Sequence, residues 1–284
     1  MRDKWKPIGS VDALFKRISS ACPESEELLR DVEGLACGAG LSSDSVLQSL
    51  NRRHKYLVRF VLPVAELTGW PKIAPPDLAG WLAAHLHFIA LWRVLDDVLD
   101  EPATPIMRPR KILRMLDSLA LAISSLTRVG AHRVDIMGLL EATTRAAEEE
   151  RVSALPLERI WQRAGPYLIV PTELLSSDAL EIYRGYLNAM GLGHDIVDLP
   201  RDLELGIRTL PVKWFTDLSP DRELRPDLIQ NYFWRSRFEF DNAISGLRAS
   251  IGDRFPIVLA LIEDADCYGV PDVLMTAERP ERSP

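Results

Sequence analysis

The sequence has few cysteines and no long apolar or basic run, and each absence argues against a class of protein. Its three cysteines, Cys22, Cys37 and Cys267, are odd in number and widely spaced, unlike a disulfide framework or a zinc site. The most apolar stretch, residues 81–92, is shorter than the roughly 20 residues that cross a membrane, and no apolar stretch follows the charged first residues as in a secretory signal. The net charge is −7, and no basic run exceeds residues 108–111, which argues against a nucleic-acid partner. We therefore expect a cytoplasmic protein with reduced thiols and no transmembrane segment.

The spacing of apolar residues indicates the fold class. They recur at three- and four-residue intervals through almost the whole chain, whereas alternation with a period of two is scarce. This pattern predicts an all-α fold, which proline and glycine clusters divide into about ten helices. Because no glycine- or serine-rich linker separates these helices, we predict one domain over residues 1–276 and a polar, disordered tail at 277–284.

An acidic motif lies at the C-terminal end of a very apolar stretch that is expected to be helical. Asp96 and Asp100 are four residues apart and share one helical face, with Asp97 beside them. Negative charge is unfavourable at a helix C-terminus, so we expect a cation there, and carboxylate oxygens suit Mg²⁺. Trp92 and Phe88 lie one and two turns earlier on the same face, where their rings would stabilise a cationic group. A solvated helix end above core aromatics would give the same pattern.

A second acidic motif follows about a hundred residues later. His194, Asp198 and Asp202 are spaced to share one helical face, and Asp195 lies next to them. We take Asp195, Asp198 and Asp202 as candidate metal ligands, and we expect Pro200 to bend the helix and move Asp202 off this face. The His194–Asp195 pair also fits an HD-type phosphohydrolase, but the other histidines show no matching order.

Together, the two motifs resemble those of the class I isoprenoid synthase superfamily. The sequence Asp-Asp-Val-Leu-Asp at residues 96–100 is similar to its first aspartate-rich motif. Residues 194–211, which end in Asp-Leu-x-x-Gly-x-x-Thr-Leu-Pro, resemble the second motif of trans-polyprenyl diphosphate synthases. The resemblance covers about residues 40–215. It implies a helical bundle around a central apolar cavity, in which three Mg²⁺ ions would join a diphosphate to both motifs.

The resemblance also implies an enzyme that ionises an allylic prenyl diphosphate. Asp96, Asp97, Asp100 and Asp195 would then be catalytic, together with Arg163, which resembles the diphosphate-sensing arginine of terpene cyclases.

Further residues are expected to bind the substrate. Gly165, before Pro166, would break the helix of Arg163 beside the cavity. Arg208, and after it Lys213, would bind the diphosphate. The apolar side chains expected to line the cavity are Phe88, Trp92, Tyr186 and Met190.

Departures from the family leave the reaction open. Elongating synthases have Gly-Gly-Lys-x-x-Arg-Pro where this chain has residues 51–55, and Arg-Arg-Gly where it has Glu101-Pro102. Both segments are associated with isopentenyl diphosphate, so this acceptor and a different small molecule, as in moenomycin-type prenyltransferases, both stay open. We favour a prenyltransferase because of the Thr-Leu-Pro ending of the second motif. The alternatives are a class I terpene cyclase and a non-catalytic prenyl-diphosphate-binding subunit. The family also suggests a homodimer.

Overall fold

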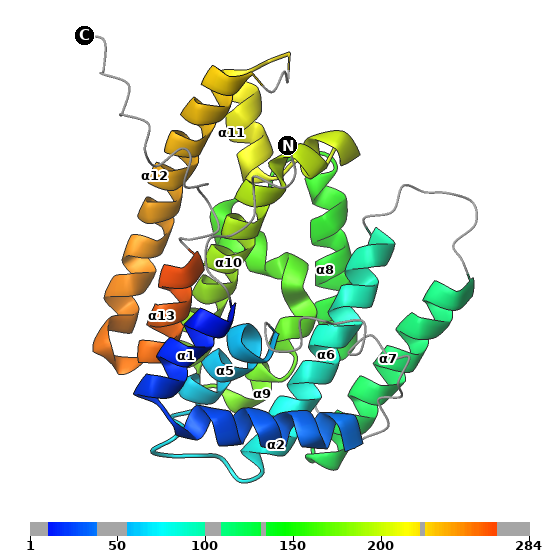
Figure 1. The fold of residues 1–284 in the computed structure, drawn as a ribbon. Helices are drawn as coiled ribbons and strands as arrows, with labels where there is room; N and C mark the ends of the chain where they lie inside the picture. The colour runs from blue at the N-terminus through cyan, green and yellow to red at the C-terminus, as the bar shows by residue number, and fades with distance from the viewer. Residues whose placement is uncertain (1–10, 39–55, 100–108, 132–134, 222–224, 266–284) are drawn as a thin grey trace.

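The computed structural model describes residues 11–38, 56–99, 109–131, 135–221 and 225–265. These residues form helices and no strand, so the predicted all-α fold of about ten helices is confirmed (Figure 1). The predicted tail at 277–284 lies outside the described residues. The elements are α1 (Val11–Ala21), α2 (Glu24–Gly38), the π-helix η2 (Leu57–Val61), α5 (Leu62–Leu67), α6 (Leu78–Leu99), α7 (Pro109–Arg128), α8 (Ile136–Glu150), the 3₁₀-rich η3 (Leu157–Leu168), α9 (Pro171–Leu174), α10 (Ser177–Leu205), α11 (Leu210–Leu218), α12 (Pro226–Ile251), the 3₁₀ turn η4 (Gly252–Arg254) and α13 (Pro256–Ala265).

Two long helices, α6 and α10, organise the bundle. Helix α6 packs against α2, α7 and η3, whereas α10 packs against η3, α11, α12 and α13 (Figure 1). The main core lies among these helices, and a smaller cluster lies between α6 and α7. Because η3 contacts both α6 and α10, it joins the two helices that carry the acidic motifs.

Helix α6 is also the most apolar of the long helices. One window in the described residues, Leu78–Leu95, is long and apolar enough to cross a membrane. However, 72% of this window is buried inside the protein, as in the core helix of a globular domain.

The ends of α10 follow from local sequence. The Ser176 hydroxyl accepts a hydrogen bond from the Ala179 amide at 3.3 Å and caps the first turn. The helix ends at Gly206, whose φ of 73° lies in the left-handed region that favours glycine. Between these caps the helix runs for 29 residues and carries the whole second acidic motif.

Pro200 does not interrupt α10. Proline cannot donate a hydrogen bond to the carbonyl four residues earlier, here that of Ile196. The Tyr232 hydroxyl of α12 donates to this carbonyl at 3.2 Å, so the helix continues with its carbonyl satisfied. The expectation that Pro200 moves Asp202 off the face was therefore wrong, since Asp202 still faces the same cavity as Asp195 and Asp198.

A second proline has the same kind of partner. Pro63 leaves the Arg59 carbonyl without its helical donor, and the Tyr186 hydroxyl of α10 donates to it at 2.6 Å. The next carbonyl, that of Phe60, accepts a hydrogen bond from His85 Nε2 of α6 at 3.2 Å. This stretch is the π-helix η2, a rare conformation that often occurs at functional sites. Helices α6 and α10 thus hold η2 in place.

Candidate functional site

A cavity of about 260 Å³ lies among η2, α6, α8, η3 and α10. Its lining changes in character along α10. Leu187 and Met190 line one end, whereas Asp195, Asp198 and Asp202 line the other. At 1.5 Å per residue, Leu187 and Asp202 lie about 22 Å apart along the helix axis. The cavity therefore has an apolar end and a charged end.

A break in η3 and its close packing against α8 place Arg163 at the charged end of the cavity. The backbone of η3 leaves helical geometry at Ala164 (φ −107°, ψ 33°), so the break predicted at Gly165–Pro166 is confirmed one residue earlier. Gly165 itself packs on α8, where its amide donates to Thr143 Oγ1 at 3.1 Å. A Cβ at this position would lie only 2.6 Å from the Leu139 carbonyl oxygen, so only glycine fits. Gly165 therefore positions η3 but does not line the cavity.

A second glycine allows η3 to approach α10. A Cβ on Gly191 would lie 2.5 Å from Ile160 Cγ2 and 3.3 Å from Arg163 Nη2. Because Gly191 has no Cβ, Arg163 can pass beside it and reach Asp195 one turn further along α10.

Arg163 forms a buried ion-pair network. Its Nη1 and Nη2 donate to Oδ1 and Oδ2 of Asp195 at 3.1 and 2.8 Å, and Nη1 also contacts Glu150 Oε2 at 3.4 Å. Burial alone would lower the pKa of Arg163, but Asp195 and Glu150 together raise it above its ordinary value. The guanidinium therefore stays in its charged form. It would bind an incoming anion if that anion replaced Asp195 as its partner.

The environment of Asp202 disfavours its charged form. Burial, followed by the negative charge of Asp195, raises its pKa to about 8, although the Thr209 hydroxyl donates to Oδ2 at 3.1 Å and opposes this shift. Asp198 is more open, with His194 Nδ1 at 3.5 Å and Arg201 Nη1 at 3.9 Å from its Oδ2. Three carboxyl groups therefore face one small space.

The ligand atoms on this face of α10 are of the type that Mg²⁺ prefers. Asp195, Asp198 and Asp202 offer only oxygen atoms, and a cation would stabilise the charged form of Asp202, whose pKa is raised by burial and then by the charge of Asp195. Within the described residues, however, no three acidic, histidine or cysteine side chains converge closely enough to hold a metal ion. A site formed by this face would therefore need the carboxylates of the first motif.

The first motif lies largely beyond the described atoms. Asp96 and Asp97 belong to the last turn of α6, but their side chains are outside the described part of the structure, as is the whole of Asp100. Trp92 and Arg93, one turn earlier on α6, line the cavity. The C-terminal end of α6 thus approaches the same cavity as the second motif.

Aromatic side chains form a continuous wall at the apolar end. The rings of Tyr56 and Phe60 stack with centroids 6.0 Å apart, and Phe60 stacks on Tyr167 at 4.6 Å with planes 20° apart. Trp92 meets Tyr167 edge-on at 6.3 Å. All four rings line the cavity, so a cation at this end would face several π-systems.

The structure brings together six of the described residues predicted for the site. They are Trp92, Arg163, Met190, Asp195, Asp198 and Asp202.

Four other predicted residues lie elsewhere. Phe88 is fully buried in the cluster between α6 and α7, because α6 is covered on both sides and residue 88 faces α7. Tyr186 is fully buried and bonds to the Arg59 carbonyl instead of facing the cavity. Arg208 is exposed and donates to the Val152 carbonyl at 2.7 Å, and Lys213 is exposed on α11. The predictions that Phe88 and Tyr186 line the cavity were therefore wrong, and Arg208 and Lys213 do not line it either.

Several lining residues escaped sequence reasoning. Arg59 and Phe60 lie in the π-helix, a conformation with no signature in the sequence. Glu150 ends an acidic run that resembles a solvated helix end. Thr209 belongs to the Thr-Leu-Pro ending, so the motif itself could have identified it.

Comparison of the chain with protein-family models, curated proteins and solved structures found no match. The resemblance to class I isoprenoid synthases therefore rests on the two motifs and their spacing.

Proposed function

We propose that this chain is an enzyme that binds an allylic prenyl diphosphate in the cavity and ionises it, transferring the prenyl cation to a second small molecule. The observation that carries the proposal is the polarity of one cavity, with carboxylates and Arg163 at one end and stacked aromatic rings at the other. A prenyl diphosphate has the same division, since its anionic head and apolar chain are joined by the bond that breaks.

The charged end would hold the diphosphate. Arg163 and Arg201 would donate hydrogen bonds to its oxygens and stabilise the charge that develops as the carbon–oxygen bond breaks. Asp195, Asp198 and Asp202, with the first-motif residues Asp96, Asp97 and Asp100, would hold Mg²⁺. The bound metal would neutralise the leaving diphosphate.

The aromatic end would protect the cation. The faces of Phe60, Tyr167 and Trp92 offer cation–π attraction, and close packing behind them keeps water from the reacting carbon. The same wall supports the alternative of a class I terpene cyclase, because a cation held among aromatic faces can react with its own double bonds.

Diphosphate release tests the proposal. Purified protein with Mg²⁺ is given allylic diphosphates of 5, 10, 15 and 20 carbons, with and without isopentenyl diphosphate, and extracts are analysed for prenylated products and hydrocarbons. We expect Asp198→Asn to slow release roughly 100-fold, as expected when a group that stabilises transition-state charge is lost. Asp241→Asn is the matched control, because this α12 carboxylate pairs with Arg237 and does not line the cavity.

The products separate the candidate reactions. Release that depends on an acceptor supports transfer, whereas release from a single substrate with a cyclic product supports the cyclase. Absence of release, despite binding, would indicate the non-catalytic subunit. Equal activity of Asp198→Asn and Asp241→Asn would contradict the site.

A further inference from the structure

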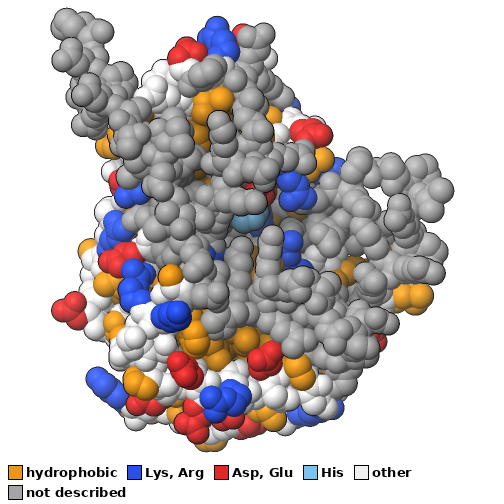
Figure 2. All heavy atoms as spheres, in the orientation of Figure 1, with side chains coloured by type: hydrophobic (Ala, Val, Ile, Leu, Met, Phe, Trp, Pro, Cys, Tyr) orange, Lys and Arg blue, Asp and Glu red, His pale blue; other side chains and the backbone are white. Residues whose placement is uncertain are grey.

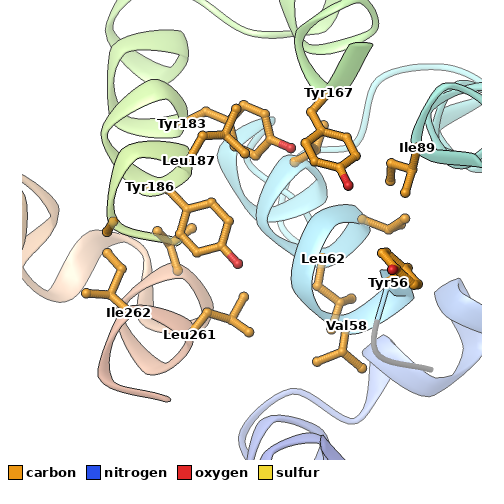
Figure 3. Packing of buried hydrophobic residues seen from close by; sticks show 14 of the residues in the cluster. Tyr56, Val58, Leu62, Ile89, Tyr167, Tyr183, Tyr186, Leu187, Leu261 and Ile262 are labelled. Atoms are coloured by element: carbon orange, nitrogen blue, oxygen red, sulfur yellow. The ribbon is translucent and has the colours of Figure 1, made fainter. Parts of the chain in front are cut away.

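The two ends of the cavity are held in place in different ways. Figure 3 shows Tyr167 of η3 and Leu187 of α10, which both line the cavity, among other buried side chains of the main core. Their positions follow from close packing. At the charged end, Arg163 is held by ion pairs with two acidic side chains, Asp195 of α10 and Glu150 of α8. An ion pair can exchange one partner for an incoming ion, so the charged end can rearrange without repacking of the core.

Glu150 occupies a position where a negative charge needs compensation. It is only 4% exposed, and it lies at the C-terminal end of α8, where the helix macrodipole disfavours an acidic side chain. Its Oε2 lies 3.4 Å from Arg163 Nη1, so the guanidinium offsets both effects. The backbone here is anchored as well, because the Glu150 carbonyl accepts from the Arg208 amide at 2.8 Å and Arg208 Nη1 donates to the Val152 carbonyl at 2.7 Å. Glu150 thus presents a negative charge at a fixed position beside Arg163.

The preceding residue, Glu149, forms an ion pair between the same two elements. Its Oε1 and Oε2 accept from Nη1 and Nη2 of Arg159 at 3.0 and 2.8 Å, and neither residue lines the cavity. The Glu149–Arg159 pair therefore joins α8 to η3 outside the cavity. The Glu150–Arg163 pair joins them inside it, with both residues in the cavity lining.

We propose that Glu150 is a positioning residue, which keeps Arg163 at the charged end while the guanidinium exchanges Asp195 for the diphosphate of the substrate. This inference rests on the proposed function. The N–H groups of Arg163 that bind Asp195 become available to a diphosphate only when Asp195 releases them. Because Glu150 lies on a different helix, it stays beside the guanidinium during this exchange. Arg163 would touch the diphosphate, whereas Glu150 acts through Arg163.

Binding of inorganic pyrophosphate tests this role without requiring turnover. Calorimetry with the full-length chain and Mg²⁺ compares the wild type with Glu150→Gln. By charge alone, the loss of an acidic side chain beside a bound anion would strengthen binding. We expect the opposite, a loss of affinity of about tenfold, because Arg163 is no longer held beside the anion once it leaves Asp195.

Glu149→Gln is the matched control, because it removes the same charge from the same helix end outside the cavity. It should change the affinity by less than about twofold. In an Arg163→Gln background, Glu150→Gln should also change the affinity by less than about twofold, since Glu150 then has no guanidinium to position. Glu150→Met, which removes the charge and leaves no buried amide, replaces Glu150→Gln if that variant does not fold, and it should act in the same direction.

The outcomes separate this inference from the proposed function. If the wild type binds pyrophosphate and Glu150→Gln binds it equally well or more tightly, the role of Glu150 is overturned and the proposed function is left intact. An equal loss in Glu149→Gln, or the same loss in the Arg163→Gln background, also overturns it, because Glu150 would then not act through Arg163. Failure of the wild type to bind pyrophosphate with Mg²⁺ overturns the proposed function as well.

Discussion

At the scale of single residues, the charge balance of the cavity depends on Arg163. Its guanidinium holds Asp195 through two hydrogen bonds and also contacts Glu150, and all three side chains are largely withdrawn from water. In such a network each buried charge is stabilised by an opposite charge beside it. Loss of Arg163 would remove the cation beside two buried carboxylates, whereas loss of Asp195 would leave Arg163 only its longer contact with Glu150.

We predict that Arg163→Leu and Asp195→Leu each lower the free energy of unfolding by about 3 kcal/mol, because each leaves a buried charge behind. The double variant should lose clearly less than the sum, because it removes both charges together. Urea unfolding of the four proteins at pH 7.5, without Mg²⁺, measures this coupling. Additive losses would show that the two side chains do not depend on each other.

Sequence alone predicted the residues whose position follows from helical periodicity. His194, Asp198 and Asp202 were assigned to one face of one helix, with Asp195 beside them, and all four line the cavity. For these four, only the expected displacement of Asp202 by Pro200 was wrong. Phe88 and Tyr186 were misplaced because both sides of their helices are buried, so periodicity could not decide which side faces the cavity.

At the scale of elements, two prolines within helical segments are accommodated by tyrosines from neighbouring helices. The Ile196 carbonyl, which Pro200 cannot serve, accepts from Tyr232, and the Arg59 carbonyl, which Pro63 cannot serve, accepts from Tyr186. The sequence identifies the prolines but not their partners, which lie on helices far along the chain. For this reason the helical fold could be predicted from the sequence, whereas the continuation of α10 through Pro200 and the π-helix η2 could not.

We predict that Tyr232→Phe lowers the free energy of unfolding by about 1–3 kcal/mol, because the buried Ile196 carbonyl loses its donor. In a Pro200→Ala background, the restored amide can donate to this carbonyl, so Tyr232→Phe should then cost less than about 1 kcal/mol. Chemical denaturation of all four proteins measures the difference. The same cost in both backgrounds would show that the hydroxyl acts on something other than this carbonyl.

At the scale of the whole molecule, charged side chains on the face seen in Figure 2 are of mixed sign, with basic and acidic groups interspersed among the described residues. Inside the protein, a buried carboxyl group links two helices that are far apart in the sequence. Glu66 of α5 is buried and accepts hydrogen bonds from the amides of Ile257 and Val258 at 2.8 and 2.7 Å, so it caps α13 across 191 residues of sequence. It thereby joins the segment after η2 to the last described helix.

Burial raises the pKa of Glu66 from 4.5 to about 7, and the two amide hydrogen bonds only partly oppose this shift. The folded state therefore holds its proton up to about pH 7, whereas the unfolded chain releases it near pH 4.5. Stability from this group is fully present below pH 4.5 and is lost as the pH rises to 7. Two buried histidines act oppositely, because burial lowers the pKa of His85 to about 3 and that of His87 to about 4.

A comparison with Glu66→Gln isolates the carboxyl group, since both proteins contain the two histidines and their contributions cancel. At pH 4.5, where Glu66 is protonated, we expect Glu66→Gln to be about 1–3 kcal/mol less stable than the wild type, because the glutamine NH₂ group cannot accept the second of the two amide hydrogen bonds. Between pH 4.5 and 7 the wild type should lose about 3 kcal/mol relative to Glu66→Gln, and above pH 7 the difference should stay constant. Urea unfolding at half-unit pH steps measures it. If the difference between the two proteins instead stays the same from pH 4.5 to 8, the carboxylate stabilises α13 by as much as its burial costs, and the pKa of Glu66 is not raised.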